Sequence, residues 1–349
     1  MKGRKQLPVW ALVVIDLLAA AVCTGVVVLV VYLLPQGTAV QDTEDTELRE
    51  QFSLPSAGSA DDTTGALGIT PASQNDWSHT ATGKLELSQT EADAFAAAQK
   101  TRETVASHTG ATSEITIEKV SCTLDGEPLV YFSADIYVTS TRCIKTAFAK
   151  SMYGKNIRSF VNTMARDNGA LLAISGDSYG ESSQTCVIRN GTLYNDNAGT
   201  ADVCVLYDDG VMKTYTAAQF DAQQAIQDGA WQAWTFGPAL LDGAGGLPSS
   251  FHTTEYINKV NPRCAIGYIA PGHYKFVLVE GRQDGYSAGV TISQLAALMQ
   301  EEGCLTAYNL DGGKSAVMWY DGDWVSKPIG GGRTISDCIY IPMESETEE

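Results

Sequence analysis

Two loops near the C-terminus concentrate carboxylates, an arginine and glycines. In "EGRQDG", at positions 280–285, Arg282 lies between Glu280 and Asp284, and in "NLDGG", at 309–313, Asp311 precedes a glycine pair. Carboxylates can protonate or attack a glycosidic centre, and arginine binds phosphate with two parallel hydrogen bonds. Glycines let backbone N–H groups approach an anion. The combination suits a sugar phosphate, and polar loop tips without a function have the same composition.

The elements around these loops predict that they meet. The stretch from Tyr274 to Gly313 reads strand, loop, helix, strand, loop, and its helix "TISQLAALMQEEG" ends at Gly303. A β-α-β unit makes two parallel strands with a right-handed crossover, so the C-terminal ends of both strands share one sheet edge. We therefore expect Glu280 and Arg282 to lie near Asp311.

Other candidate residues follow predicted strands. The run "LLAISGD" ends in Asp177, "WTFGPALLDG" contains Gly237, "NPRCAIGY" contains Arg263, and Arg333 follows "GGG". A buried strand that finishes in Gly-Asp presents its carboxylate at a site or simply turns. Lone arginines are usually surface residues, so spacing alone does not single these two out.

The segment "DGGKS", at 311–315, ends like a nucleotide-binding P-loop. The complete pattern G-x-x-x-x-G-K-[ST] requires a glycine five residues before Gly313, where this chain has Tyr308. The first glycine makes the tight turn around the phosphate, which tyrosine does not easily adopt. The segment is therefore interpreted as a glycine turn with another role.

Composition excludes several classes of function. The chain has 349 residues and a formal net charge of −18, which argues against nucleic-acid partners and against binding an anionic membrane surface. Its eight cysteines include no C-x-x-C pair, which argues against a zinc site. Most lie in apolar, strand-like runs and are interpreted as small buried hydrophobic residues.

The N-terminus has the pattern of a signal-anchor. Residues 1–8 contain Lys2, Arg4 and Lys5 and are predicted to be a cytoplasmic tail, and residues 9–34 a single transmembrane helix. From Leu17 to Leu34 there are 18 consecutive residues without a charge, about the length that crosses a hydrocarbon core of ~30 Å. A cleaved signal peptide has a shorter apolar region. The prediction is a single-pass protein of the cell membrane with its C-terminal domain extracellular.

Residues 35–112 are predicted to be an acidic, mostly disordered stalk. They are rich in Asp, Glu, Thr, Ser, Gly and Pro and poor in aromatic residues, so they cannot bury enough apolar surface to become ordered. Within them, Ser88 and Glu91 form an S-x-x-E capping box. Good helix formers follow, and they predict a helix near 89–107.

Residues 113–345 are predicted to form one α+β domain, strand-rich, with a mixed sheet and a few packed helices. Short β-branched and aromatic runs recur between Gly, Asn and Asp residues. The Asn-Gly of "RNGT" and the Asp-Gly of "YDDGVM" are typical of tight hairpin turns.

The ordered set of fragments resembles the phosphodiester glycosidase domain family. The fragments are "LLAISGDSYG", "CVIRNGTLY", "WTFGPALLDG", "NPRCAIGY", "FVLVEGR", "YNLDGGKSAV" and "GGGRTISDCIYI", and they extend from about Ser121 to Met343. The family includes the lysosomal uncovering enzyme, which removes N-acetylglucosamine from a phosphodiester on mannose-6-phosphate, and bacterial proteins associated with exopolysaccharide biosynthesis. The resemblance implies a hydrolase of sugar-1-phosphodiester linkages.

Carried over to this sequence, the resemblance assigns two groups of site residues. The catalytic candidates are Asp311, Asp177 and Glu280, and the substrate or phosphate-binding candidates are Arg282, Arg263, Asn309, Gly312, Gly313, Ser315, Arg333 and Gly237. Which carboxylate is acid, base or nucleophile stays open. Three positions depart from the family pattern: Ser175 replaces asparagine, Glu280 replaces aspartate, and Lys314 replaces a third glycine.

No cofactor is expected, and a divalent cation held by Asp177 and Asp311 is the alternative. The expected partners are a glycan or sugar-phosphate substrate and, through the N-terminal helix, the membrane. The predicted substrates are cell-envelope or exopolysaccharide glycans. Two other functions remain open: a non-catalytic glycan-binding module, which the departures at Lys314 and Ser175 favour, and a structural partner in an envelope assembly.

Overall fold

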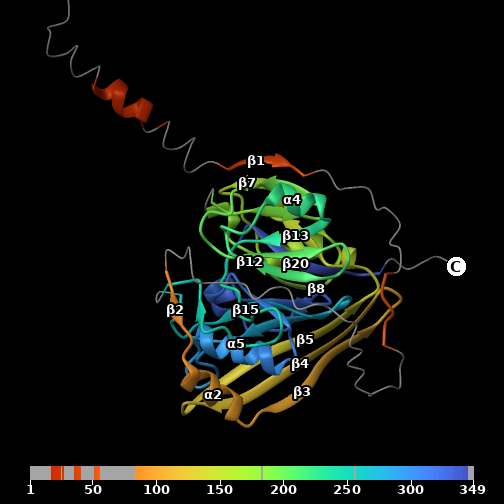
Figure 1. Cartoon of the computed structure of the whole chain (residues 1–349). Coiled ribbons are helices and arrows are strands. Elements are labelled where there is room, and N and C mark those ends of the chain that lie inside the picture. Colours follow the sequence, from red (N-terminus) through yellow and green to blue (C-terminus); the bar gives the residue numbers. More distant parts are fainter. Residues whose placement is uncertain are drawn as a thin grey trace, which may run out of the picture.

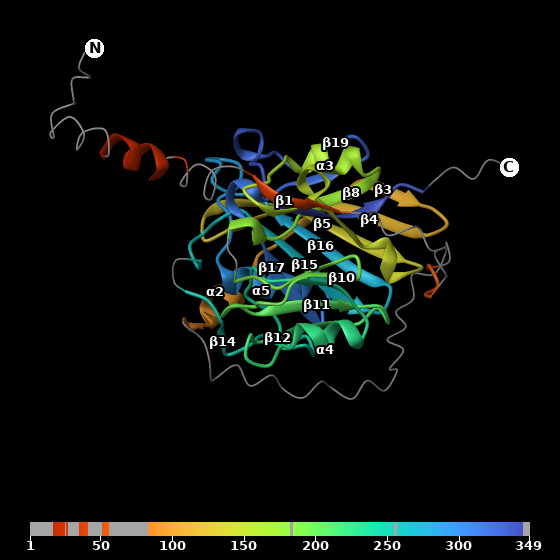
Figure 2. The same ribbon diagram turned by 90° about the horizontal axis from the view of Figure 1, so that it is seen from above.

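The computed structural model describes residues 17–24, 26, 35–40, 51–55, 83–181, 184–254 and 257–344. Its body contains three larger sheets. The largest is a six-stranded sheet in the order β17-β15-β16-β5-β4-β3 (Figures 1 and 2). Its strands are β3 (Thr101–Thr109), β4 (Ser113–Leu124), β5 (Glu127–Val138), β15 (Arg263–Ala270), β16 (His273–Val279) and β17 (Thr306–Leu310).

Two five-stranded sheets lie over one face of the six-stranded sheet. The second sheet has the order β19-β18-β8-β20-β6, from β6 (Lys145–Phe148), β8 (Ala170–Ser175), β18 (Met318–Tyr320), β19 (Asp323–Trp324) and β20 (Asp337–Pro342). The third has the order β10-β9-β13-β11-β12, from β9 (Val187–Arg189), β10 (Thr192–Asn195), β11 (Val203–Tyr207), β12 (Met212–Tyr215) and β13 (Ala230–Trp234). Two small pairings join β1 (Gln36–Ala39) to β7 (Met152–Lys155) and β2 (Leu85–Glu86) to β14 (Ser250–Phe251).

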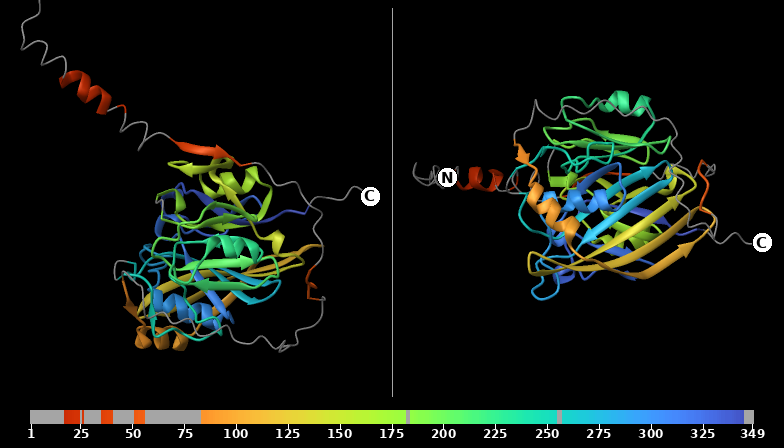
Figure 3. Two further views of the ribbon diagram at one scale, coloured as in Figure 1. Left: turned by 45° about the horizontal axis from the view of Figure 1, so that its top comes forward. Right: turned by 60° about the horizontal axis from the view of Figure 1, so that its bottom comes forward.

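The hydrophobic core is divided by the six-stranded sheet. On one face Phe276 and Ile117 pack with Leu172 of the second sheet and Leu206 of the third. The other face is covered by α2 (Gln89–Ala97) and α5 (Ile292–Glu301), which lie along the sheet in Figure 3. Two shorter helices, α3 (Val161–Asp167) and α4 (Ala222–Gln227), pack on the second and third sheets. The alternating burial of strand residues thus builds an apolar layer on each face of the six-stranded sheet.

The predicted crossover helix is α5. Thr291 caps it through a capping box with Gln294, and Leu295, Leu298 and Met299 are buried against the sheet. It connects β16 to β17, but these strands are not neighbours, because β15 lies between them and pairs antiparallel with both. Every pairing between the described strands is antiparallel. The prediction of a mixed sheet, which rested on the β-α-β pattern, is therefore wrong. Strands β16 and β17 still run in the same direction and end at the same edge.

The predicted helix at 89–107 is shorter than expected. It begins at Gln89, where the Ser88 hydroxyl accepts a hydrogen bond from the Glu91 N–H (3.4 Å), and it ends at Ala97. Residues 101–109 form β3 instead, because they pair with β4 along their length. Phe95 is fully buried in the apolar cluster that α2 and α5 form with this face of the sheet. The described part of the predicted stalk from residue 83 onward therefore packs with the domain.

The two predicted hairpin turns are confirmed. Asn190 and Gly191 both have positive φ, 51° and 77°, at the turn between β9 and β10. Gly210, with φ 85°, closes the β11–β12 hairpin. Left-handed backbone is least strained at glycine and asparagine, which accounts for the sequence signal.

Most of the predicted anchor, residues 9–34, lies outside the described residues. Residues 17–24 are helical and exposed. Among the residues that the structure describes, no helix is both long and apolar enough to span a membrane. The predicted stalk at 41–50 and 56–82 also lies outside them.

Candidate active site

The ends of β15, β16 and β17 meet at one edge of the six-stranded sheet. The register pairs Cys264 with Leu310, which places Arg263 beside Asp311. The segment around Gly237 runs along β17: the Asn309 amide side chain donates to the Gly237 carbonyl (2.7 Å), and the Asn309 N–H donates to the Pro238 carbonyl (3.1 Å). The prediction that both loops share an edge is confirmed.

The end of β8 in the second sheet closes the same edge. The Asp311 N–H donates to the Gly176 carbonyl (3.1 Å), and the Ser175 hydroxyl donates to the Ser315 carbonyl. The two sheets therefore meet at the turn that follows β17. A serine fits at 175, where the family has asparagine, because its hydroxyl has a backbone partner.

Asp311 is the carboxylate at the centre of this meeting point. It is 4% exposed, and its Oδ2 lies 3.1 Å from Nη2 of Arg333. Arg333 also donates from Nε to the Ser315 hydroxyl (3.0 Å). Burial raises the pKa of Asp311, while hydrogen bonds from Ser315 and Ser178 and the charge of Arg333 act in the opposite direction. The Arg333 side chain is 44% exposed, so its guanidinium extends from the buried acid toward solvent.

The glycine pair is required by close packing. A Cβ on Gly312 would lie 2.8 Å from the Pro262 carbonyl oxygen, and Gly313 has a φ of 62°. The Gly313 N–H donates to the same Pro262 carbonyl (2.9 Å). Lys314 is exposed and its backbone is outside the left-handed region, so the lysine fits the turn without distortion.

Two arginines lie next to this turn. Arg282 has a φ of 55°, its Nε donates to the Asn261 side-chain oxygen (2.8 Å), and its guanidinium lies close to Gly313. Arg263 is buried and donates to the carbonyls of Ile257, Lys259 and Val290. Burial and the charge of Arg282 lower the pKa of Arg263 to about 10. Within the described part of the chain neither arginine forms an ion pair with a carboxylate. Arg282 is exposed, so its charge favours an anionic ligand, whereas the Arg263 guanidinium is held by backbone carbonyls.

Glu280 ends β16 at the same edge and has engaged oxygens. Its Oε1 accepts the Lys327 N–H (2.5 Å) and its Oε2 accepts from the Gln283 amide (2.9 Å). Burial raises the pKa of Glu280, and these hydrogen bonds, with the charges of Lys327 and Lys119, oppose the shift. Both oxygens of this carboxylate are therefore hydrogen-bonded.

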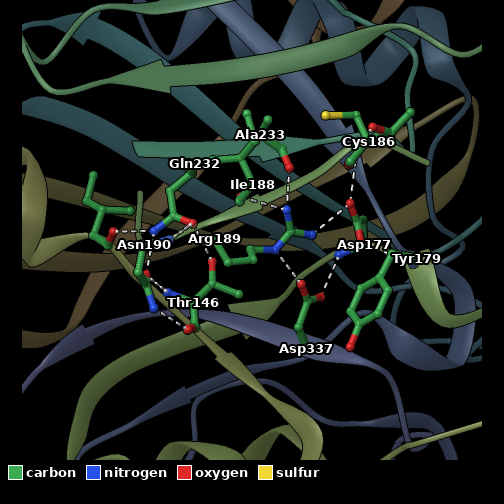
Figure 4. Close-up of polar contacts among 12 residues, drawn as sticks. Thr146, Asp177, Tyr179, Cys186, Ile188, Arg189, Asn190, Gln232, Ala233 and Asp337 are labelled. Carbon is green, nitrogen blue, oxygen red and sulfur yellow. Dashed lines mark hydrogen bonds and ion pairs between the residues drawn. The ribbon is translucent and has the colours of Figure 1, made fainter. Parts of the chain in front are cut away.

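Asp177 lies at the end of β8, but its carboxylate is directed into the third sheet. It is fully buried, with Oδ2 2.9 Å from Nη2 of Arg189 and 3.0 Å from the Thr235 N–H, while Oδ1 accepts the Tyr179 N–H (Figure 4). Arg189 also binds Asp337, with a distance of 2.7 Å from Nε to Oδ2. Burial raises the pKa of Asp337 to about 7; the charge of Arg189 opposes this, and that of Asp177 adds to it.

Several residues of the site had no sequence signal. Arg189 lies 148 positions from Asp337 and was interpreted only as part of a hairpin. Ser178 and Asn261, which contact Asp311 and Arg282, are small polar residues in loops. Among the described residues, no group of three or more His, Cys, Asp or Glu side chains is arranged to hold a metal ion.

Comparisons with known proteins agree with this architecture. Residues 168–342, half of the chain, match the family described as Phosphodiester glycosidase, and the chain belongs to this family. The SPbeta prophage-derived uncharacterized protein YomE of Bacillus subtilis (strain 168) is 30% identical over 198 residues, which cover 55% of this chain and 31% of that protein. The chain thus spans about a third of the length of this curated relative.

Two solved structures share the fold. The catalytic domain of zebrafish N-acetylglucosamine-1-phosphodiester alpha-N-acetylglucosaminidase, auto-inhibited by its pro-peptide, aligns with a TM-score of 0.54 and 17% identity over 76% of this chain and 97% of that chain. A hypothetical protein from Synechocystis aligns with a TM-score of 0.52 and 14% identity over 65% of this chain and 61% of that chain. At these identities the likeness concerns the fold alone.

Proposed function

We propose that this protein is a glycosidase that cleaves sugar-1-phosphodiester linkages. The observation that carries the proposal is a buried carboxylate, Asp311, in contact with the half-exposed Arg333 at a glycine turn where Arg282 lies close to Gly313. Family membership supports the same reaction class. A phosphodiester offers an anionic group for the arginines and an anomeric carbon for the carboxylate.

The residues divide into roles by what they contact. Arg282 and Arg333 hold the phosphate and stabilise the charge that the leaving phosphate gains, because Arg282 lies close to Gly313 and Arg333 contacts Asp311 and Ser315 of the same turn. Asp311 acts in its ionised form. It either attacks the anomeric carbon or accepts a proton from the water that attacks this carbon. Glu280 is the second carboxylate of the edge. Asp177 is a positioning residue, because Arg189 and two backbone N–H groups engage its oxygens.

The proposed location follows from the N-terminal sequence. An apolar run after a basic tail supports a signal-anchor, with the domain outside the cell. Cell-envelope and exopolysaccharide glycans carry sugar-phosphate bonds and are the proposed substrates.

The test measures release of free sugar by the full-length protein from UDP-N-acetylglucosamine and a panel of sugar-1-phosphodiesters. Asp311→Asn should lower turnover about a hundredfold or more, because it removes the ionised group at the reacting carbon. Asp167→Asn, the same change at an exposed position in α3, is the matched control and should retain wild-type turnover. Equal rates for Asp311→Asn and wild type would overturn the proposal.

A second candidate function is a glycan-binding module without turnover. It is favoured by one observation: the carboxylate oxygens of all three candidates, Asp311, Glu280 and Asp177, are engaged by neighbouring groups, whereas glycosidases commonly use two carboxylates that act on the substrate. If no substrate is released while glycan binding depends on Arg282, tested with Arg282→Met, this function is the correct one.

A further inference from the structure

A groove opens beside the Glu280 end of the site, between the six-stranded sheet and the β18–β19 hairpin. Its volume is about 370 Å³, and its principal lining residues are Lys119, Phe132, Tyr286, Tyr320, Trp324 and Lys327. Ligand pockets commonly have volumes of roughly 300–1,000 Å³, so the groove has room for a small ligand segment.

The two sheets build its walls. Lys119 and Phe132 are register partners on β4 and β5, and both face the second sheet. Tyr320 and Trp324 come from β18 and β19 opposite them. At one end the Tyr320 hydroxyl donates to the Ser107 carbonyl (3.1 Å), which ties the hairpin to β3.

At the other end, residues that line the groove contact Glu280 of the candidate active site. The Lys327 N–H binds Glu280, and the Lys327 ammonium lies 4.0 Å from the centre of the Tyr286 ring. Gln283 bridges Glu280 and the Lys327 carbonyl. The charges of both Lys119 and Lys327 act on Glu280. Glu280, at the end of β16, is therefore bonded to Lys327, a residue that lines the groove.

The chemistry of the lining favours an anionic sugar. Neither Lys119 nor Lys327 forms an ion pair with a carboxylate among the described residues, although the whole chain has a net charge of −18. The Tyr286 hydroxyl is buried and has no hydrogen-bond partner within the described structure. Aromatic rings pack on the apolar faces of sugar rings, and lysines bind anionic substituents as point charges.

We propose that this groove binds an anionic oligosaccharide segment of the substrate, with sugar rings against Trp324 and Tyr286 and an anionic group between Lys119 and Lys327. The inference rests on the proposed function in one respect: the bound segment continues from the sugar whose linkage is cleaved. The anionic group is a phosphate or a carboxylate, since two lysines attract either.

Binding is measured by calorimetric titration on full-length Asp311→Asn protein, so that no ligand is turned over. The probes are phosphorylated mannopentaose, the same oligosaccharide without phosphate, and a hyaluronan hexasaccharide. Binding of phosphorylated mannopentaose identifies a phosphate as the recognised group, and binding of hyaluronan identifies a carboxylate. Either anionic probe should bind at least about tenfold more tightly than the neutral one, with affinity that falls as salt rises.

The groove is then tested with variants. Lys119→Met and Lys327→Met should each weaken anionic binding about tenfold, and Trp324→Ala about fivefold. Lys213→Met is the matched control, because Lys213 also lies over a tyrosine ring, that of Tyr207, but outside the groove, and it should bind as the parent does. Thermal unfolding checks that each variant is folded; should Trp324→Ala unfold, the two exchanges of lysine decide the result.

Three outcomes would overturn the inference: equal binding of neutral and anionic probes, unchanged binding in both lysine variants, or an equal loss in Lys213→Met. Failure of the proposed function is a separate result, because it is measured as sugar release. If the wild-type protein releases no sugar and Lys327→Met weakens binding of the anionic probes, the inference about the groove is supported and the proposed glycosidase function is overturned.

Discussion

At Asp311, burial and charge act on the pKa in opposite directions. Burial raises it above the usual value of 3.8, and the charge of Arg333 limits that rise. Because Asp311 is proposed to act ionised, activity should fall as pH drops through its raised pKa. In Arg333→Met the limiting charge is gone, so the acid limb of the kcat/KM profile should move to higher pH.

The same variant should also lose phosphate binding, and kcat/KM at its optimum should fall about tenfold or more. Arg333→Lys keeps the charge and is the control, with its acid limb near that of the wild type. A pH–rate profile of the three proteins measures both effects. An acid limb that stays in place in Arg333→Met would contradict the assignment of that limb to ionised Asp311.

Residue-level prediction from sequence succeeded where the chain places the groups on consecutive strand ends. Glu280, Arg282 and Asp311 were expected at one edge, and the directions of β16 and β17 bring them there. The Asp177–Arg189–Asp337 network was not foreseen, because it joins three strands from two sheets and has no local spacing. The direction of the Asp177 side chain depends on that network, so a strand ending in Gly-Asp could not reveal it.

At the scale of elements, this network holds β8, β9 and β20 together. The buried guanidinium of Arg189 forms ion pairs with two buried carboxylates, those of Asp177 and Asp337. Burial raises the pKa of Asp337 to about 7. An acid with a raised pKa binds more protons in the folded than in the unfolded state. Its contribution therefore favours folding at acid pH and is lost as pH rises from about 4 toward 7.

Arg189→Met leaves both carboxylates without their partner. We expect the free energy of unfolding at neutral pH to fall by about 3–5 kcal/mol. Part of that loss should return at pH 5, where protonation removes the uncompensated charge. Urea unfolding at several pH values measures this, with Arg166→Met on the surface of α3 as the control. A loss independent of pH would contradict the charge argument.

Element boundaries were predicted best where capping chemistry is explicit. Ser88 caps α2 as its S-x-x-E pattern predicts, and α5, capped by Thr291, begins where the predicted helix "TISQLAALMQEEG" begins. Strand β3 was missed, because seven of its nine residues are exposed and no apolar alternation marks it. The insertion of β15 between β16 and β17 was missed as well, because strand order depends on contacts between segments far apart in sequence.

For the whole molecule, the elements before Ser113 that pack on the six-stranded sheet lead us to propose that the folded unit begins before this residue. Strand β3 protects the edge of β4, and α2 buries Phe95 against α5. A chain that begins at Ser113 would expose the long edge of β4 and the apolar surface beneath α2. Such an edge is a template for association between chains.

We therefore expect a chain starting at Gly83 to be monomeric and to unfold cooperatively, and one starting at Ser113 to aggregate or to unfold at a lower temperature. Within the longer chain, Phe95→Ala should lower the free energy of unfolding by about 3–5 kcal/mol, which isolates the contribution of α2. Size-exclusion chromatography and thermal unfolding compare the three proteins. Equal behaviour of the two chains would show that α2 and β3 add no stability to the domain, and the domain would then begin at β4.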